Sequence, residues 1–156
     1  MTTTPNSGEI GTLIVVILKA RNLPNKRHLG KQAPYCTILF NEEMRRTKVI
    51  KRGGQHPEWD EEIRFTLFED DTPLEDGGGN HMRLSCFADD PREPDLIGET
   101  QVDLTEVLTT GETDEWFTLT HRDRYCGEVY LELTFWSNVR PPAFGMQMST
   151  LIYLSP

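Results

Sequence analysis

The sequence predicts an all-β fold, an eight-stranded antiparallel β-sandwich, and three observations carry this prediction. Short segments in which apolar and polar residues alternate, such as 63–68 and 129–135, are typical of strands with one buried face. Turn residues such as Gly53-Gly54 and Pro57 separate these segments. The length of 156 residues fits one domain whose core is large enough to be stable without disulfides.

The first strand carries the strongest signal. Residues 12–18 form an uncharged run of Thr, Leu, Ile and Val, which favours a strand covered on both faces. We expect this strand at 10–19, ending before Pro24, because proline lacks the backbone N–H that a ladder needs. The other strands are expected at 35–40, 44–51, 63–68, 82–87, 96–102, 115–119 and 127–136. A short helical turn is expected to begin at 103–106 and to end before Gly111.

The chain is expected to have three parts. Residues 1–9 form a polar, flexible N-terminus, and 10–137 form the folded domain. Residues 138–156 contain Pro141-Pro142, which favours a tail or the start of a linker. Three roles stay open for this tail: docking on a sheet edge, weak self-association, or being the cut end of a longer protein. We expect no secretory signal and no transmembrane helix, because the first residues are polar and no apolar run reaches about 18 residues.

No motif in the sequence predicts catalysis or a bound cofactor. Cys36, Cys86 and Cys126 are an odd number without zinc-site spacing, so we expect reduced thiols in a cytoplasmic protein. The four histidines are dispersed, and neither a Gly-x-Ser-x-Gly elbow nor a P-loop occurs. An enzyme is therefore the least expected class, and we expect no cofactor.

Charge is divided unevenly along the chain. Residues 1–56 carry +7 and residues 57–156 carry −16, which together give the net charge of −9. This division favours one basic patch on an acidic body. An acidic body argues against nucleic-acid binding.

The candidate binding residues are basic side chains near the strand expected at 44–51 and in the loop before the second strand. They are Arg45, Arg46, Lys48, Lys51 and Arg52, with Lys26, Arg27 and Lys31 in the loop. A cationic patch attracts anionic phospholipid with about 1 kcal/mol per basic residue near the membrane surface. The alternative, of equal weight, is that these side chains are solvated or pair with the many acidic residues.

Several motifs together resemble the C2 domain family, a group of β-sandwiches best known for docking on membranes. They are Ala20-Arg-Asn-Leu-Pro24, Gly30-Lys-Gln-Ala-Pro-Tyr35, Arg46-Thr-Lys-Val49, Gln55-His-Pro-Glu-Trp-Asp-Glu-Glu62 and Asp95-Leu-Ile-Gly-Glu99. The resemblance covers about residues 10–137. It implies the permuted (type II) C2 topology, in which the strand that opens other C2 domains comes last, here at 127–136.

A narrower set of motifs is similar to the C2 domain of the fungal ingression proteins, which act in cytokinesis. The set comprises Lys19-Ala-Arg-Asn-Leu-Pro24, Arg52-Gly-Gly-Gln-His-Pro57, Ile97-Gly98 with Val102-Asp-Leu104, and Gly127 with Leu131-Glu-Leu-Thr-Phe135. This resemblance implies a non-catalytic adaptor at the contractile ring and the inner face of the plasma membrane, during ingression and septum formation. It also implies that SH3-domain scaffold proteins bind a Pro-rich tail that begins near Pro141. The alternative is a membrane-targeting C2 domain that binds phospholipid through its basic strand.

Calcium-binding C2 domains hold the ion with about five aspartates on two loops. In the first loop the family's two aspartate positions fall at or near Arg27 and at Ala33, and neither residue is acidic. The second loop keeps Asp89, Asp90 and Asp95. Calcium needs six to eight oxygen ligands, so carboxylates from one loop make at best a weak site. We therefore expect no metal, and we favour turn chemistry for Asp90 and Asp95.

Overall fold

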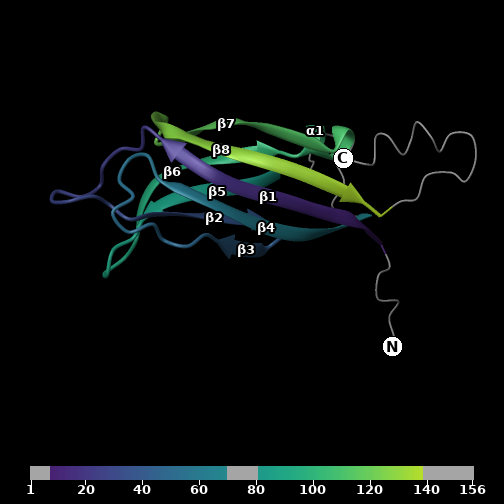
Figure 1. Ribbon diagram of the computed structural model, residues 1–156, viewed down its shortest axis with the longest axis horizontal. Coiled ribbons are helices and arrows are strands. Elements are labelled where there is room, and N and C mark those ends of the chain that lie inside the picture. Colours follow the sequence, from purple (N-terminus) through teal and green to yellow (C-terminus); the bar gives the residue numbers. More distant parts are fainter. Residues whose placement is uncertain (1–7, 70–80, 139–156) are drawn as a thin grey trace, which may run out of the picture.

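The computed structural model describes residues 8–69 and 81–138, and these residues form an antiparallel β-sandwich with one short helix (Figure 1). The elements are β1 (Glu9–Arg21), β2 (Pro34–Phe40), β3 (Glu43–Arg46), β4 (Glu58–Phe68), β5 (His81–Ala88), β6 (Asp95–Asp103), α1 (Thr105–Thr110), β7 (Glu112–His121) and β8 (Arg124–Ser137). The prediction of an all-β fold with eight antiparallel strands is confirmed. The predictions for residues 1–7 of the N-terminus and for the tail after residue 138 concern segments outside the described residues, whereas Glu9, expected in the flexible N-terminus, is the first residue of β1.

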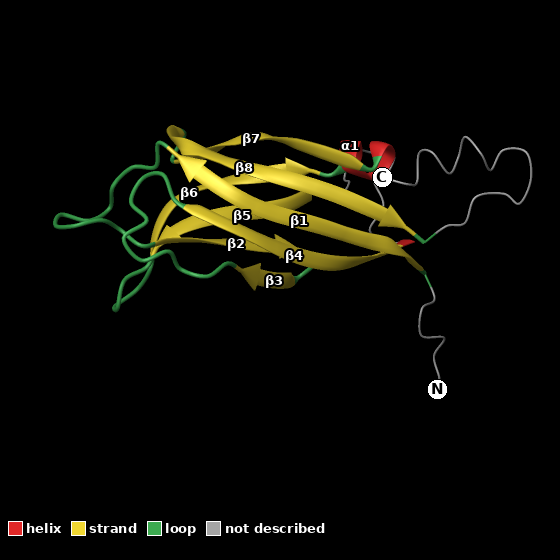
Figure 2. Ribbon diagram, viewed as in Figure 1, coloured by secondary structure: helices red, strands yellow, loops and turns green. Residues whose placement is uncertain are grey.

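The strand order is β3-β2-β5-β6-β7-β8-β1-β4. A single residue pair, Glu99 with Thr120, joins β6 to β7, so the order divides there into two four-stranded layers (Figure 2). The last strand, β8, pairs with the first strand, β1, along most of its length. The permuted C2 topology stays a prediction, and this pairing of the first and last strands is the observation that bears on it.

The core lies between the layers and receives alternate side chains from both. Leu13, Val15 and Ile17 of β1 are fully buried, and they join Trp59 and Phe65 of β4 in the central apolar cluster. Burying one such side chain contributes about 1.5–3 kcal/mol. The core therefore accounts for the period-two pattern that predicted the strands.

The outer face of β1 departs from the sequence prediction. Thr12, Ile14, Val16 and Leu18 are only half-buried, so the expectation that both faces of this strand are covered is wrong. The apolar run instead belongs to a strand that lies between β8 and β4 and whose outer face is only partly covered.

The third strand is shorter than its sequence predicts. It ends at Arg46 rather than at residue 51, because the buried side chain of Thr47 interrupts the ladder. The Thr47 hydroxyl accepts the Cys36 backbone N–H at 3.0 Å, in the place of a backbone carbonyl, and donates to the Lys48 carbonyl at 2.9 Å. Residues 47–57 consequently form a loop that leads to β4, which starts at Glu58, five residues before its predicted beginning.

Candidate functional site

Three loops meet at one end of the sandwich (Figure 1). They span residues 22–33, 47–57 and 89–94, and they follow β1, β3 and β5. The first two loops each carry three Lys or Arg residues and no Asp or Glu, whereas 89–94 has a net charge of −2. This loop end is therefore strongly cationic on a chain whose net charge is −9.

A buried amide holds the first two loops together. Gln32 is fully buried, and its Nε2 donates to the Pro24 carbonyl at 2.9 Å and to the Gly54 carbonyl at 3.0 Å. Its Oε1 accepts the Lys26 backbone N–H at 2.7 Å. A buried amide that satisfies its donors and its acceptor stabilises one loop arrangement and disfavours others. The sequence did not predict this positioning role of Gln32, because a single glutamine gives no signal beyond its place in the 30–35 motif.

Further contacts join the loops to the strands. The Trp59 indole N–H donates to the Pro34 carbonyl at 3.2 Å, and the Asp89 N–H donates to the Ala33 carbonyl at 2.9 Å. The Gln55 side chain donates to the Leu23 carbonyl at 2.7 Å. Hydrogen bonds thus fix the backbone of the loop end that carries the basic side chains.

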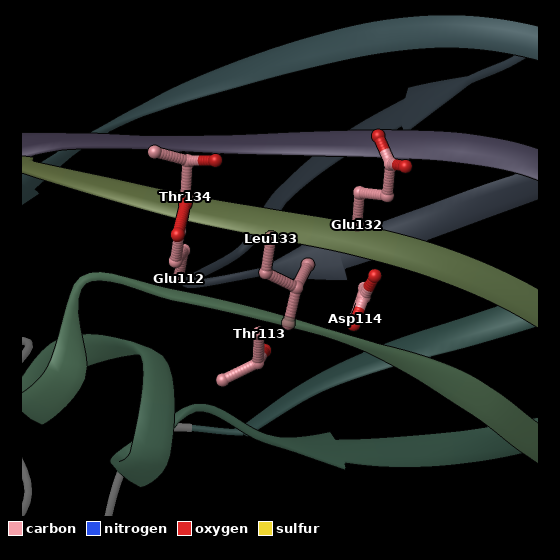
Figure 3. A pocket seen from close by; sticks show the side chains of 6 residues that line it. All are labelled: Glu112, Thr113, Asp114, Glu132, Leu133 and Thr134. Atoms are coloured by element: carbon pink, nitrogen blue, oxygen red, sulfur yellow. The ribbon is translucent and has the colours of Figure 1, made fainter. Parts of the chain in front are cut away.

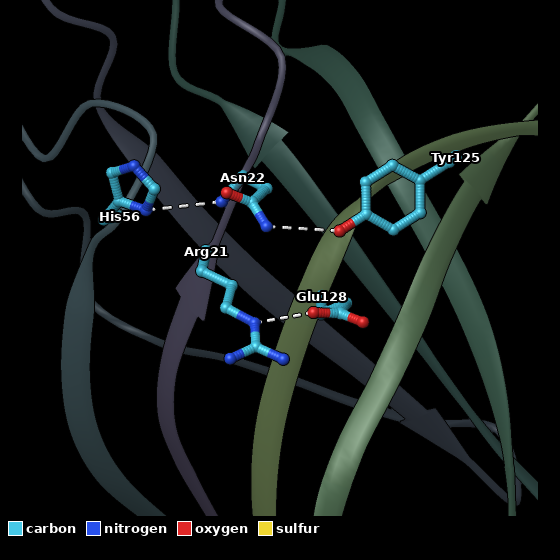
Figure 4. Close-up of polar contacts among 5 residues, drawn as sticks. All are labelled: Arg21, Asn22, His56, Tyr125 and Glu128. Atoms are coloured by element: carbon cyan, nitrogen blue, oxygen red, sulfur yellow. Dashed lines mark hydrogen bonds and ion pairs between the residues drawn. The ribbon is translucent and has the colours of Figure 1, made fainter.

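A polar network ties the end of β1 to the start of β8 (Figure 4). Arg21 Nε donates to Glu128 at 2.6 Å, and the Asn22 side chain donates to the Tyr125 hydroxyl at 3.3 Å. The Asn22 backbone N–H donates to His56 Nδ1 at 3.3 Å, which connects this network to the loop 47–57. His56 therefore has a structural partner, and this network positions the first loop as it leaves the sheet.

Between the loops lies an open depression with a volume of about 520 Å³. Its charged lining residues are Arg27, Lys31, Lys51, Arg52, Asp89 and Asp90. Four basic side chains therefore surround two aspartates, which leaves a local excess of positive charge. Leu29, at 85% exposure, also lines the depression and gives it an apolar projection. Such a surface suits a ligand in which an anionic group lies next to an apolar part.

The structure separates the sequence-predicted basic residues into two groups. The first group comprises Arg27, Lys31, Lys51 and Arg52 around the depression, with Lys26 exposed in the same loop. The second group lies along β3 and just after it, and comprises Arg45, Arg46 and Lys48. The sequence placed Lys51 on a strand with the second group, whereas the structure places it in the loop end.

The second group already contacts the protein itself. Arg45 pairs with Glu43, and the Arg46 guanidinium lies 4.1 Å from the centroid of the Tyr35 ring. Burial raises the pKa of Tyr35, while the Arg46 charge acts in the opposite direction. Lys48 Nζ donates to the Trp59 carbonyl at 3.2 Å. These contacts make the β3 group less available to a ligand than the loop end.

The aspartates of the second loop do not converge on one point. Asp90 accepts the Arg92 N–H at 2.9 Å, which is the turn contact expected of an aspartate in this position. Asp95 pairs with Ala88 in the β5–β6 ladder and does not line the depression. Within 8–69 and 81–138, no group of three or more Asp, Glu, His or Cys residues is arranged to hold a metal ion.

Comparisons with known proteins agree with this architecture. The model of the C2 domain family matches residues 11–119. Ingression protein fic1 of Schizosaccharomyces pombe is 33% identical over 127 residues, which are 81% of this chain and 44% of the fic1 chain. Ingression protein 1 of Saccharomyces cerevisiae is 27% identical over 134 residues, 83% of this chain and 31% of that protein. The chain thus spans less than half of the length of either ingression protein.

A solved structure supports the same fold. The paired C2 domains of extended synaptotagmin 2 match with a TM-score of 0.68 and 28% identity, over 81% of this chain and 41% of that one. None of the helices in the described ranges has the length and apolar composition that a membrane crossing requires. The strand pattern, the loop end and the match over residues 11–119 lead to one conclusion: the chain belongs to the C2 domain family.

Proposed function

We propose that this chain is a non-catalytic, calcium-independent C2 module of a fungal cytokinesis protein. It acts as an adaptor at the division site, on the cytoplasmic face of the plasma membrane, where its loop end touches anionic phospholipid. The observation that carries the proposal is the depression in which four basic side chains surround two aspartates. The similarity to the ingression proteins supports the part in cytokinesis.

The charges around the depression support the calcium independence that we propose. A calcium ion needs several carboxylate oxygens within about 2.3–2.6 Å, and most of the balancing charge must come from them. Here Arg27 and Lys31 bring positive charge to the same space, and Asp90 already accepts a backbone N–H. The basic side chains replace the bridging role that a calcium ion would have between the protein and an anionic lipid.

The expected lipid affinity is modest. Each basic residue near an anionic surface contributes about 1 kcal/mol, so four residues opposed by two aspartates give roughly 2–4 kcal/mol. Leu29 adds the burial of one exposed apolar side chain. A contact of this strength is reversible, and it concentrates the protein at the membrane without fixing it there. This weakness favours the adaptor role, in which scaffold partners supply the remaining affinity, including SH3-domain proteins that bind the tail after Pro141.

The experiment is co-sedimentation with vesicles that contain phosphatidylserine, against vesicles of phosphatidylcholine alone. Each set is measured with calcium and with a chelator, at low and at physiological salt. We expect binding to the anionic vesicles alone, unchanged by the chelator and weakened by salt, because exposed charges are screened over about 8–10 Å.

Two matched double variants locate the contact. Lys31→Glu/Lys51→Glu removes charge from the depression, and Arg45→Glu/Arg46→Glu removes the same charge from β3. We expect the first to abolish most of the binding and the second to have a smaller effect. If the β3 variant has the larger effect, the main contact is the sheet face. Binding that requires calcium, or no binding under any condition, contradicts the proposed lipid contact.

A further inference from the structure

A second depression lies between β7 and β8, on the outer face of the layer formed by β7, β8, β1 and β4. We call it the acidic groove; it has a volume of about 440 Å³ and is lined by Glu112, Thr113, Asp114, Glu132, Leu133 and Thr134 (Figure 3). The β7–β8 register places Asp114 directly opposite Glu132, and Glu112 opposite Thr134. Like charges directly opposite each other in a sheet are destabilising, and the hydrogen bond that Asp114 accepts from the Tyr130 hydroxyl at 2.8 Å offsets only part of this cost.

The two arginines on this face pair with other carboxylates, and Lys19 Nζ lies 5.8 Å from the centroid of the Trp116 ring. Arg64 pairs with Glu62 at 2.5 Å, and Arg21 pairs with Glu128 at 2.6 Å. None of the ion pairs in the described part of the chain includes Glu112, Asp114 or Glu132. The groove therefore keeps its negative charge, and the net charge of −9 reinforces it at longer range.

An apolar stripe runs beside the groove along β1. Val16 pairs with Glu132 on one side and with Glu62 on the other, and it is half-buried, as is Ile14. At the far end of the stripe Trp136 is 43% exposed. Val16 thus lies between two carboxylates, whereas Ile14 lies between Thr134 and Arg64. Partly exposed aliphatic side chains with charged residues beside them form an apolar contact zone with a charged rim.

We propose that this face is a docking surface for a short basic segment of a partner protein, in which Lys or Arg residues are separated by apolar residues. The cations enter the acidic groove, and the apolar side chains cover Ile14 and Val16. Charge complementarity selects this occupant over an anionic membrane, which the carboxylates repel. A second copy of the chain is disfavoured because its net charge of −9 is repelled at long range. The inference stands on the groove and the stripe alone and does not require the loop end to bind lipid.

The test measures fluorescence anisotropy of a labelled synthetic peptide of alternating Lys and Val residues, titrated with the 156-residue chain. We expect saturable binding that weakens as salt is raised. A Lys-Ser peptide with the same charge should bind at least about fivefold more weakly, because it lacks the apolar contacts. A Glu-Val peptide should not bind.

Matched charge reversals show whether the groove is the site. Glu112→Lys/Glu132→Lys and Glu93→Lys/Glu106→Lys each change the net charge from −9 to −5. The first should raise the Kd of the Lys-Val peptide at least about tenfold. The second, on exposed residues that do not line the groove, should change it less than about threefold. Circular dichroism and thermal unfolding check that both variants are folded.

Three outcomes would overturn the inference. Equal losses in the two variants would show attraction to net charge alone. Equal affinity for the Lys-Val and Lys-Ser peptides would remove the role of the apolar stripe. Sedimentation velocity that shows self-association of the unmodified chain, lost in the groove variant, would assign the face to a second copy instead of a basic partner.

Discussion

The sharpest stability prediction concerns Gln32, the buried side chain between the first two loops. Replacing it in Gln32→Leu keeps the approximate volume and removes three hydrogen bonds, to Pro24, Gly54 and Lys26. The backbone groups of these three residues lose their side-chain partner. The Gly54 bond is buried, whereas the other two are partly buried, so water replaces them in part.

The magnitude follows from these environments. An unsatisfied buried polar group costs about 1–3 kcal/mol, and a partly hydrated one costs less. The expected decrease in the free energy of unfolding is therefore about 2–4 kcal/mol. For a chain of this size that decrease corresponds to a fall in Tm of about 5–15 °C.

The assay is urea unfolding followed by tryptophan fluorescence, with Gln55→Leu as the matched control. Gln55 is an exposed glutamine on the neighbouring loop, and its side chain makes one hydrogen bond, to the Leu23 carbonyl. The control should lose about 0.5–1 kcal/mol. If Gln32→Leu loses less than about 1 kcal/mol, or no more than the control, then the buried amide does not organise the loop end and the reasoning is refuted.

Three further predictions concern other sites. Gly127→Ala should lower the free energy of unfolding, measured with urea, by at least about 2 kcal/mol. The reason is that φ of Gly127 is +96° and an added Cβ would lie 2.6 Å from the Arg21 carbonyl oxygen. An unchanged free energy of unfolding would refute the close approach of the Arg21 backbone to Gly127. The Asp103 pKa is lowered by hydrogen bonds from Thr105, so its stabilisation is present above the unfolded-state pKa and is lost as pH falls through the folded-state value. Asp103→Asn should therefore lose stability, by less than about 1 kcal/mol, at neutral pH but not in acid, and an equal loss at both would contradict this. Burial raises the pKa of the Cys36 thiol, so a thiol reagent should label it, as read by mass spectrometry, no faster than the chain unfolds; rapid labelling of the native protein would show an open core.

The sequence predicts the fold well where one face of a strand is buried. The alternation at 63–68 and 129–135 marks β4 and β8, because each inner side chain enters one core and each outer side chain does not. The end of β3 was not predictable in this way. It depends on a side-chain hydroxyl of Thr47 that takes the place of a backbone carbonyl, and hydrophobic periodicity does not report such a substitution.

Sequence patterns also do not predict which residues come together at the two candidate sites. The composition predicts one basic patch, and loop closure determines which cations meet: Lys51 joins Arg27 and Lys31 because Gln32 holds two loops that are far apart in the sequence. The acidic groove follows only from the β7–β8 register, which places Asp114 against Glu132. Asp114 belongs to no motif, and the motif at 131–135 that contains Glu132 indicates a family resemblance but no binding role, so both residues were missed.

The two charged surfaces lie on different parts of the sandwich. The cationic loop end is formed by the loops that follow β1, β3 and β5, whereas the acidic groove lies on the outer face of β7 and β8. An anionic membrane attracts the first surface and repels the second. Under the proposed function, the loop end would contact the membrane while the acidic face stays accessible to a basic partner, which is the geometry that an adaptor needs.

The most direct test of the lipid contact maps it residue by residue. The measurement is the loss of backbone amide NMR signals of the isotope-labelled chain when phosphatidylserine nanodiscs are added in the presence of a chelator. The account predicts that signals in the loops 22–33 and 47–57 broaden most, with Leu29 and Lys31 among them. Broadening confined to the outer faces of β2 and β3, or broadening that appears only after calcium is added, would contradict it.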